Sequence, residues 1–293
     1  MIKVNYLKRN NVKKYIFSFI IMLLIIIMYI KFLNQPVSVK NLIKTEKIEY
    51  LIPIKTIYFE DFNFPNITCT GLTYDNKDNA FWIVDYGAIN STEIPKPQLI
   101  EINLEMNKII KIIALDNIDD DKPNLQGITY NISNDSLFVA SGKHIYNIDK
   151  NGEIIKKINI NKYEKYLTNG VAYNNISNDL WTLLYSKYLL QCDSNGNINK
   201  KIKMNYKDQD QIFIDEKNNY LYISIGADYL GNDNYLLEYD LYNEKVNKLY
   251  RVDESYAIEG ISIVNGKLYV VNDGLYHSAK IKKSYINIYD LNK

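Results

Sequence analysis

The chain has 293 residues, with 35 Lys and Arg against 34 Asp and Glu, which gives a formal net charge of +1. Charges of both signs are interspersed along it, so it lacks the basic face that electrostatic binding of nucleic acid requires. We therefore expect no nucleic-acid partner. After an apolar N-terminal segment, the remaining chain is long enough for one closed domain.

The N-terminal segment has a basic start and a long apolar stretch. Residues 15–30 carry no charge and consist mainly of Ile, Leu, Met and Phe, and extension to Leu33 gives about the length of a membrane-spanning helix. Five Lys and Arg residues precede it, which predicts a cytoplasmic tail over 1–14 and an outward-facing C-terminal domain. A cleaved signal peptide is the alternative, but no small-residue cleavage site follows. We predict a single-pass signal anchor over 15–33 in the cell membrane and a stalk over 34–50.

A short pattern recurs five times after residue 69. Each copy has a polar residue at the start of an apolar strand, followed in four copies by glycine, and then a tight polar turn and a second apolar strand. The inner strands are predicted at 70–74, 126–130, 169–173, 210–214 and 259–263.

Successive four-stranded units of this kind predict an all-β fold, a single β-propeller over residues 51–293. We expect five four-stranded blades, or six if the long first repeat contains a degenerate one. The last copy ends before an outer strand, so residues 54–59 are the predicted donor that closes the ring and removes two exposed edges.

The two faces of this propeller are predicted to differ. The connections on one face are minimal turns, whereas long loops at 85–97, 226–234 and 272–284 gather on the other, where function is usually found. Four tyrosines fall at the loops of this upper face, long or short, and are predicted to form a ligand-binding rim: Tyr86, Tyr185, Tyr229 and Tyr276.

The residues that open the inner strands form a polar ring at the channel mouth: Thr70, Gln126, Asn169, Asp210 and Glu259. Carboxylate and amide oxygens converging from separate segments suit a hard cation such as Ca²⁺. This predicts a calcium site held by Glu259, Asp210 and Asn169, with Gln126 beside them. The alternative is that these residues only hydrate the channel or bond to neighbouring backbone.

His277 is the candidate catalytic residue, a general base in the long last loop. No nucleophile elbow, HExxH motif or phosphate-binding glycine loop is present in the sequence, which argues against a standard serine hydrolase or zinc protease. Cys69 and Cys192 fall in non-adjacent blades, so we predict two buried thiols and no disulfide.

Three segments carry a family resemblance: TGLTY with DNAFWIVD (70–74 and 78–85), LIEINL (99–104), and EGISI with KLYVVN (259–263 and 267–272). They resemble the SdiA-regulated family of bacterial propellers, which implies the same architecture and an N-terminal membrane segment. The chain is more loosely similar to gluconolactonase and strictosidine-synthase-like propellers. That similarity implies a divalent metal on Glu259 and Asn169, with Asp210 as a third ligand, although Thr70 and Gln126 depart from the pattern.

Together these features predict a membrane-anchored, extracytoplasmic binding or scaffolding module for a ligand or protein at the cell surface. The alternative is a metal-dependent hydrolase, lactonase-like or esterase-like, with its site at the channel mouth.

Overall fold

The computed structural model describes residues 2–33, 47–118, 124–160, 167–184, 187–204, 206, 208–225, 228–231 and 233–292. The chain divides into two compact units, Met1–Val37 and Ser38–Lys293.

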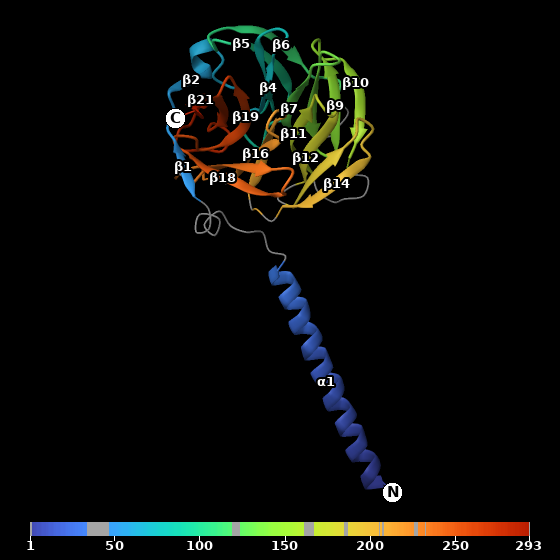
Figure 1. Cartoon of the computed structure of the whole chain (residues 1–293). Coiled ribbons are helices and arrows are strands. Elements are labelled where there is room, and N and C mark those ends of the chain that lie inside the picture. The colour runs from blue at the N-terminus through green and yellow to red at the C-terminus, as the bar shows by residue number, and fades with distance from the viewer. Residues whose placement is uncertain are drawn as a thin grey trace. The chain divides into compact units, whose positions relative to one another are not determined.

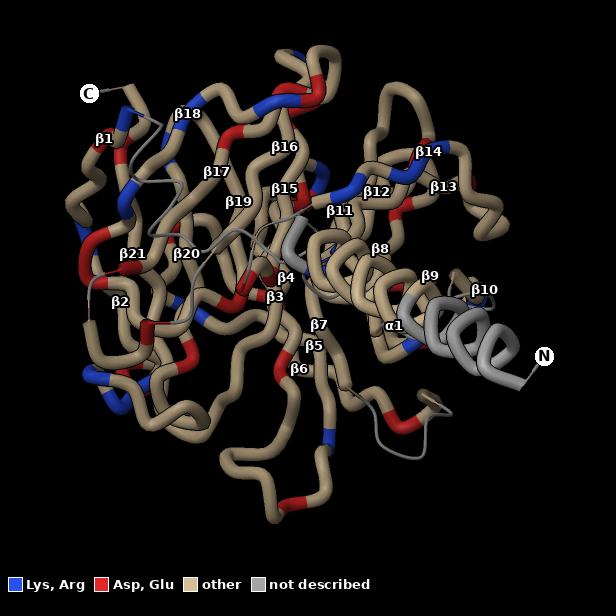
Figure 2. The backbone as a smooth tube through the Cα atoms, turned by 90° about the horizontal axis from the view of Figure 1, so that it is seen from below, with Lys and Arg blue, Asp and Glu red and all other residues tan. Residues whose placement is uncertain are grey.

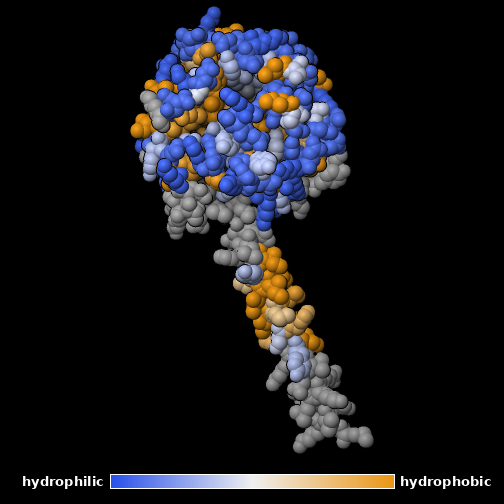
Figure 3. Space-filling view, viewed as in Figure 1, coloured by the Kyte–Doolittle hydropathy of each residue, from blue (hydrophilic) through white to orange (hydrophobic). Residues whose placement is uncertain are grey.

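The first unit is the helix α1 (Ile2–Leu33). Its large apolar side chains between Tyr15 and Ile30 are exposed (Figure 3). Among the residues whose side chains are described, no helix is both long enough and apolar enough to cross a membrane. The predicted span over 15–33 is therefore not shown. Residues 34–46 of the predicted stalk lie outside the described residues.

The second unit is a five-bladed β-propeller (Figure 1), so the predicted count of five blades is confirmed. In each of the first three blades, four consecutive strands pair antiparallel in sequence order. Their bounds are β3 (Cys69–Asp75), β4 (Ala80–Asp85), β5 (Gln98–Asn103) and β6 (Ile109–Ala114); β7 (Leu125–Asn131), β8 (Ser136–Ser141), β9 (His144–Asp149) and β10 (Ile154–Asn159); β11 (Thr168–Asn174), β12 (Asp179–Leu184), β13 (Tyr188–Cys192) and β14 (Ile198–Lys203).

The last two blades receive strands from the N-terminal side of the ring. Blade four contains β15 (Gln209–Asp215), β16 (Tyr220–Ile225), β17 (Tyr235–Asp240) and β18 (Lys245–Val252), and blade five contains β19 (Ile258–Val264), β20 (Lys267–Asp273) and β21 (Ser284–Asp290). The strand β2 (Lys55–Tyr58) pairs antiparallel with β21, from Lys55 opposite Ile288 to Tyr58 opposite Tyr285. The predicted donor at 54–59 is therefore confirmed.

A fifth strand on blade four was not predicted. The strand β1 (Ile48–Leu51) runs parallel to β18, and the backbone N–H of Asp253 donates to the Leu51 carbonyl oxygen at 3.0 Å. Residues 48–50, predicted as the end of the stalk, thus belong to a sheet. β1 covers an edge that would otherwise expose unpaired backbone groups.

The inner strands meet at a ring of glycines. A Cβ atom on Gly127 would lie 2.7 Å from the Gly170 Cα atom, and one on Gly71 would lie 2.8 Å from the Gly127 Cα atom. Only glycine permits this backbone approach. Gln211 takes the fifth position, and its Nε2 donates to the Thr70 carbonyl oxygen at 3.4 Å. At this level backbone and the Gln211 side chain occupy the centre of the ring.

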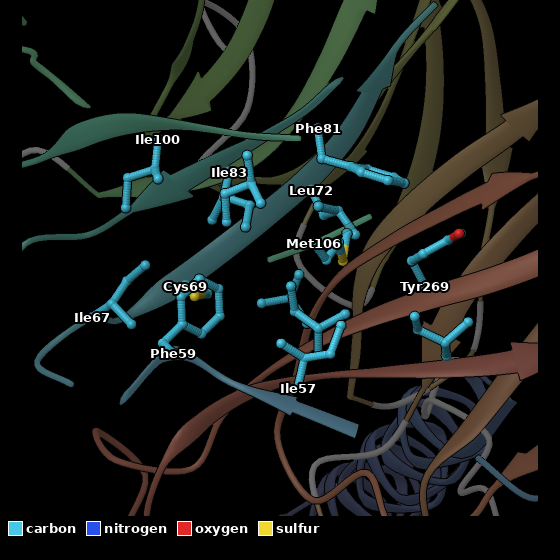
Figure 4. Close-up of a cluster of buried hydrophobic side chains, with 14 of the residues drawn as sticks. Ile57, Phe59, Ile67, Cys69, Leu72, Phe81, Ile83, Ile100, Met106 and Tyr269 are labelled. Atoms are coloured by element: carbon cyan, nitrogen blue, oxygen red, sulfur yellow. The ribbon is translucent and has the colours of Figure 1, made fainter. Parts of the chain in front are cut away.

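The core lies between neighbouring blades. Figure 4 shows the cluster between blades one and five, where Phe81 packs on Tyr269 with ring centroids 4.7 Å apart. Ile57 of β2 and Phe59 of the 3-10 helix that follows it, η1 (Phe59–Phe62), complete this cluster, so the closing strand contributes apolar burial as well as hydrogen bonds. Cys69 and Cys192 are buried free thiols, as predicted.

Candidate functional site

A local irregularity in each inner strand positions the predicted polar ring. The pairing register of every inner strand with its neighbour shifts at or beside the ring residue. A β-bulge re-aims side chains and is frequent beside functional sites. The side chains of the ring residues therefore do not follow the regular alternation of side-chain directions along the inner strands. They lie at the upper face, where these strands begin.

The structure brings three ring residues and His277 into one chain of contacts. Asn169 Nδ2 donates to Asp210 Oδ1 at 3.1 Å, and the Asp210 and Glu259 carboxyl groups are hydrogen-bonded to each other. His277 Nε2 lies 3.1 Å from Glu259 Oε1. Gln126 stands apart from this chain, with its Nε2 3.4 Å from Asn124 Oδ1.

The Asp210 and Glu259 carboxyl groups are placed to share a proton. Burial, and secondarily the Asp273 charge, raises the pKa of Glu259 well above its ordinary value. Part of Asp210 is exposed, but its carboxyl group is buried, and burial followed by the Glu259 charge raises its pKa as well. Two carboxyl groups can form a hydrogen bond only if one of them keeps a proton, so the pair titrates as a unit.

Asp273, at the end of β20, is an acidic residue of this site that the sequence did not single out. Its side chain is 0% exposed, and its Oδ1 accepts the Tyr276 backbone N–H at 3.1 Å. Its Oδ2 has no hydrogen-bond partner, and the same is true of Oγ1 of Thr70, which is 4% exposed. Burial raises the pKa of Asp273 to about 6.

These groups face a cavity of about 90 Å³ at the channel mouth. Burial lowers the pKa of His277, which favours its neutral form near pH 7. The lining residues come from blades one, two and five: Thr68, Thr70, Tyr86, Asn124, Gln126, Glu259, Asp273, Tyr276 and His277.

Aromatic rings form one side of the site. The Tyr229 ring stacks on His277 with centroids 4.4 Å apart, and Tyr86 meets Tyr276 edge to face at 5.9 Å. Three of the four predicted rim tyrosines therefore gather here. Tyr185 lies outside the described residues.

Asp85, at the end of β4, holds the loop that carries Tyr86. It accepts the Thr68 and Gly87 backbone N–H groups, each at 2.9 Å, and Gln98 Nε2 at 2.7 Å. Asp85 and Asp273 end the second strand of adjacent blades, in AFWIVD and KLYVVND. This repeated position is a signal by which the sequence could have identified both acids.

The residues predicted to bind calcium do not fit that ion as they lie. Among the described residues, no three His, Cys, Asp or Glu side chains are placed to hold a metal together. Ca²⁺ takes six to eight oxygen ligands. Here Asn169 turns its amide nitrogen to Asp210, and the bond between Asp210 and Glu259 requires a proton.

A larger cavity, of about 610 Å³, opens at the opposite end of the ring. Its lining includes one aliphatic residue from each inner strand: Leu72, Ile128, Val171, Ile212 and Ile261. The sequence had suggested only chain reversal on this face. Figure 2 shows acidic and basic residues interspersed along the backbone of the propeller.

Comparisons by sequence return nothing: no family model and no curated protein matches the chain. The resemblance to SdiA-regulated proteins therefore stays a prediction.

Solved structures match in fold. A glutaminyl cyclase from Myxococcus xanthus is 11% identical with a TM-score of 0.58, over 84% of this chain and 98% of that one. The calcium-binding protein regucalcin from Agrobacterium tumefaciens is 11% identical with a TM-score of 0.52, over 83% and 96% of the two chains. At this level of identity the similarity supports the propeller fold alone.

Proposed function

We propose that the protein is a binding module whose ligand enters the channel-mouth cavity. One observation carries this proposal: Asp273 Oδ2 and Thr70 Oγ1 are buried without partners in the same small cavity. Buried polar groups in folded proteins are nearly always paired, and an unpaired one costs about 1–3 kcal/mol. A ligand that supplies hydrogen-bond donors would recover this free energy.

The hydrolase remains the second candidate because His277 lies beside Glu259 at the channel mouth. The cyclase, by its name, is an enzyme, and regucalcin is described as a calcium-binding protein, so related folds carry both kinds of role. The contact between the Asp210 and Glu259 carboxyl groups leaves fewer oxygens free for a metal, which favours the binding module. Metal analysis and assays with p-nitrophenyl acetate and γ-butyrolactone separate the two candidates. Turnover that depends on Ca²⁺ and is lost in Glu259→Gln would favour the hydrolase.

The binding role is tested by thermal unfolding of the full chain against a panel of small cations, anions and neutral compounds. Thr70→Leu fills the cavity and removes the unpaired hydroxyl, so it serves as the blocked variant. We expect at least one compound to raise the melting temperature of the parent and not of Thr70→Leu, since a ligand that binds only the folded state stabilises it. A panel without any such compound would contradict the binding role.

For localisation, we propose that α1 anchors the propeller at the outer side of the cell membrane. The basic residues before Tyr15 and the exposed apolar side chains up to Ile30 support this proposal. Protease added to intact cells should release a propeller fragment. Full protection of the chain, or secretion of a shortened soluble form, would refute the anchor.

A further inference from the structure

On the basis of the proposed binding role, we propose that the channel-mouth cavity takes a primary alkylammonium group, the cationic end of a linear amine. Three properties of the cavity support this ligand: its charge, its unpaired acceptors and its size.

The charged side chains around the cavity are mostly acidic. Glu259 and Asp273 line it, Asp210 is bonded to Glu259, and Asp85 ends the strand next to the Tyr86 loop. His277 is the only basic side chain among the described lining residues, and it is already beside Glu259. Carboxylates removed from water are strongly destabilised unless a positive charge is close. A cationic ligand supplies that charge.

The unpaired groups favour a cation that carries N–H donors. An ionised Asp273 carboxylate has no donor and acts only as a hydrogen-bond acceptor. The Thr70 hydroxyl oxygen can also accept a hydrogen bond. A primary ammonium has three donors and no acceptor, as in lysine. A quaternary ammonium has no donor, so it would leave both oxygens unpaired. A neutral alcohol offers one donor and no charge.

The size of the cavity restricts what can enter. About 90 Å³ equals roughly three water molecules at about 30 Å³ each, which is space for an ammonium group and one or two methylenes. The rest of the amine ligand must pass Tyr86 and Tyr276, two residues of the cavity lining whose rings meet edge to face. Aromatic faces attract both cations and alkyl chains. A linear amine fits this path, whereas a bulky cation does not.

Isothermal titration calorimetry on the full chain in detergent micelles at pH 8 tests the proposal. The probes are n-butylammonium, tetramethylammonium, n-butanol and CaCl₂, and empty micelles provide the blank. We expect n-butylammonium to bind at least about tenfold more tightly than the other three. Asp273→Asn should weaken its binding by about tenfold or more, because it removes a charge-assisted hydrogen bond. Thr70→Val should weaken it by a smaller factor.

Asp240→Asn is the matched control. Asp240 is the last residue of β17, at the opposite face, and it accepts the Tyr242 and Asn243 backbone N–H groups of the following turn. This variant should bind n-butylammonium as the parent does. Melting temperatures of all variants verify that they are folded.

Further probes identify the source of the amine: putrescine for free polyamines, and glycylglycinamide for peptide N-termini. Putrescine that binds at least as tightly as n-butylammonium supports the alkylamine. Glycylglycinamide as the tightest probe would overturn it, as would equal binding of tetramethylammonium or n-butanol. If the parent binds only anions or neutral compounds at this cavity, the ammonium proposal fails and the binding role stands. If the compound panel described above gives no selective shift at all, the binding role itself fails.

Discussion

Asp273→Asn should stabilise the protein at pH 8 and leave its stability nearly unchanged at pH 4. Burial raises the pKa of this carboxyl from 3.8 to about 6 in the folded protein. Between these two pH values the folded state keeps a proton that the unfolded state releases. The stability of the parent therefore falls as pH rises through this window, and the loss is complete above about pH 7.

The size of the effect follows from the width of that window. Each pKa unit corresponds to about 1.36 kcal/mol, so a shift from 3.8 to about 6 costs the parent about 3 kcal/mol at pH 8. Asparagine carries no charge at either pH, and its side-chain oxygen can still accept the Tyr276 N–H. We expect Asp273→Asn to recover about 2–3 kcal/mol at pH 8. Near pH 4 both side chains are neutral in the folded protein, so most of the difference should vanish.

Urea unfolding of both proteins at pH 4 and pH 8 measures this difference. Asp210, Glu259 and His277 also titrate near the site, so the quantity to compare is the difference between variant and parent at each pH. Asp240→Asn is again the control, because hydrogen bonds from Asn243 lower the pKa of Asp240 and its loss should not stabilise the protein at pH 8. Destabilisation by Asp273→Asn at pH 8 would refute the reasoning, since it would mean that the ionised carboxylate is well paired.

Two further predictions concern the ring. Gly127→Ala should destabilise the protein by about 3 kcal/mol or more in urea unfolding, because Gly127 has a φ of +80° and the new Cβ atom would meet backbone atoms. Gly266→Ala is the comparison. Gly266 also has a positive φ, but its Cβ atom would meet only the flexible Asn292 side chain, so this variant should cost about 1 kcal/mol. Equal costs would contradict the tight glycine ring. A chain that begins at residue 66 loses β1 and β2 and should aggregate on size-exclusion chromatography, whereas one that begins at residue 52 loses only β1 and should stay monodisperse. Equal behaviour of the two would mean that the ring does not depend on β2.

The repeat made the fold predictable from sequence. A glycine after a polar residue at the start of an apolar strand marks four of the five inner strands, and the missing outer strand pointed to the donor now seen as β2. The strand β1 was missed because it has only four residues and pairs parallel with β18, about 200 residues away in sequence. No local pattern encodes such a partner.

The site was predictable in its location more than in its chemistry. The ring positions correctly brought Asn169, Asp210 and Glu259 together at the channel mouth. Their oxygens suggested a metal site, but whether an oxygen faces a cation or another side chain depends on rotamers that a sequence does not specify. Asp273 was missed because its importance comes from complete burial beside a neighbouring blade, which only the closed ring creates.

A crystal structure of the protein with n-butylammonium tests the central claim most directly. We expect electron density for the amine at the channel mouth, with its nitrogen within about 3 Å of Asp273 Oδ2 and its alkyl chain passing Tyr86 and Tyr276. The claim would be contradicted if the amine appeared only in the larger cavity at the opposite end of the ring. It would also be contradicted if only ordered water lay between Asp273 and Thr70 at an amine concentration that saturates the protein in calorimetry.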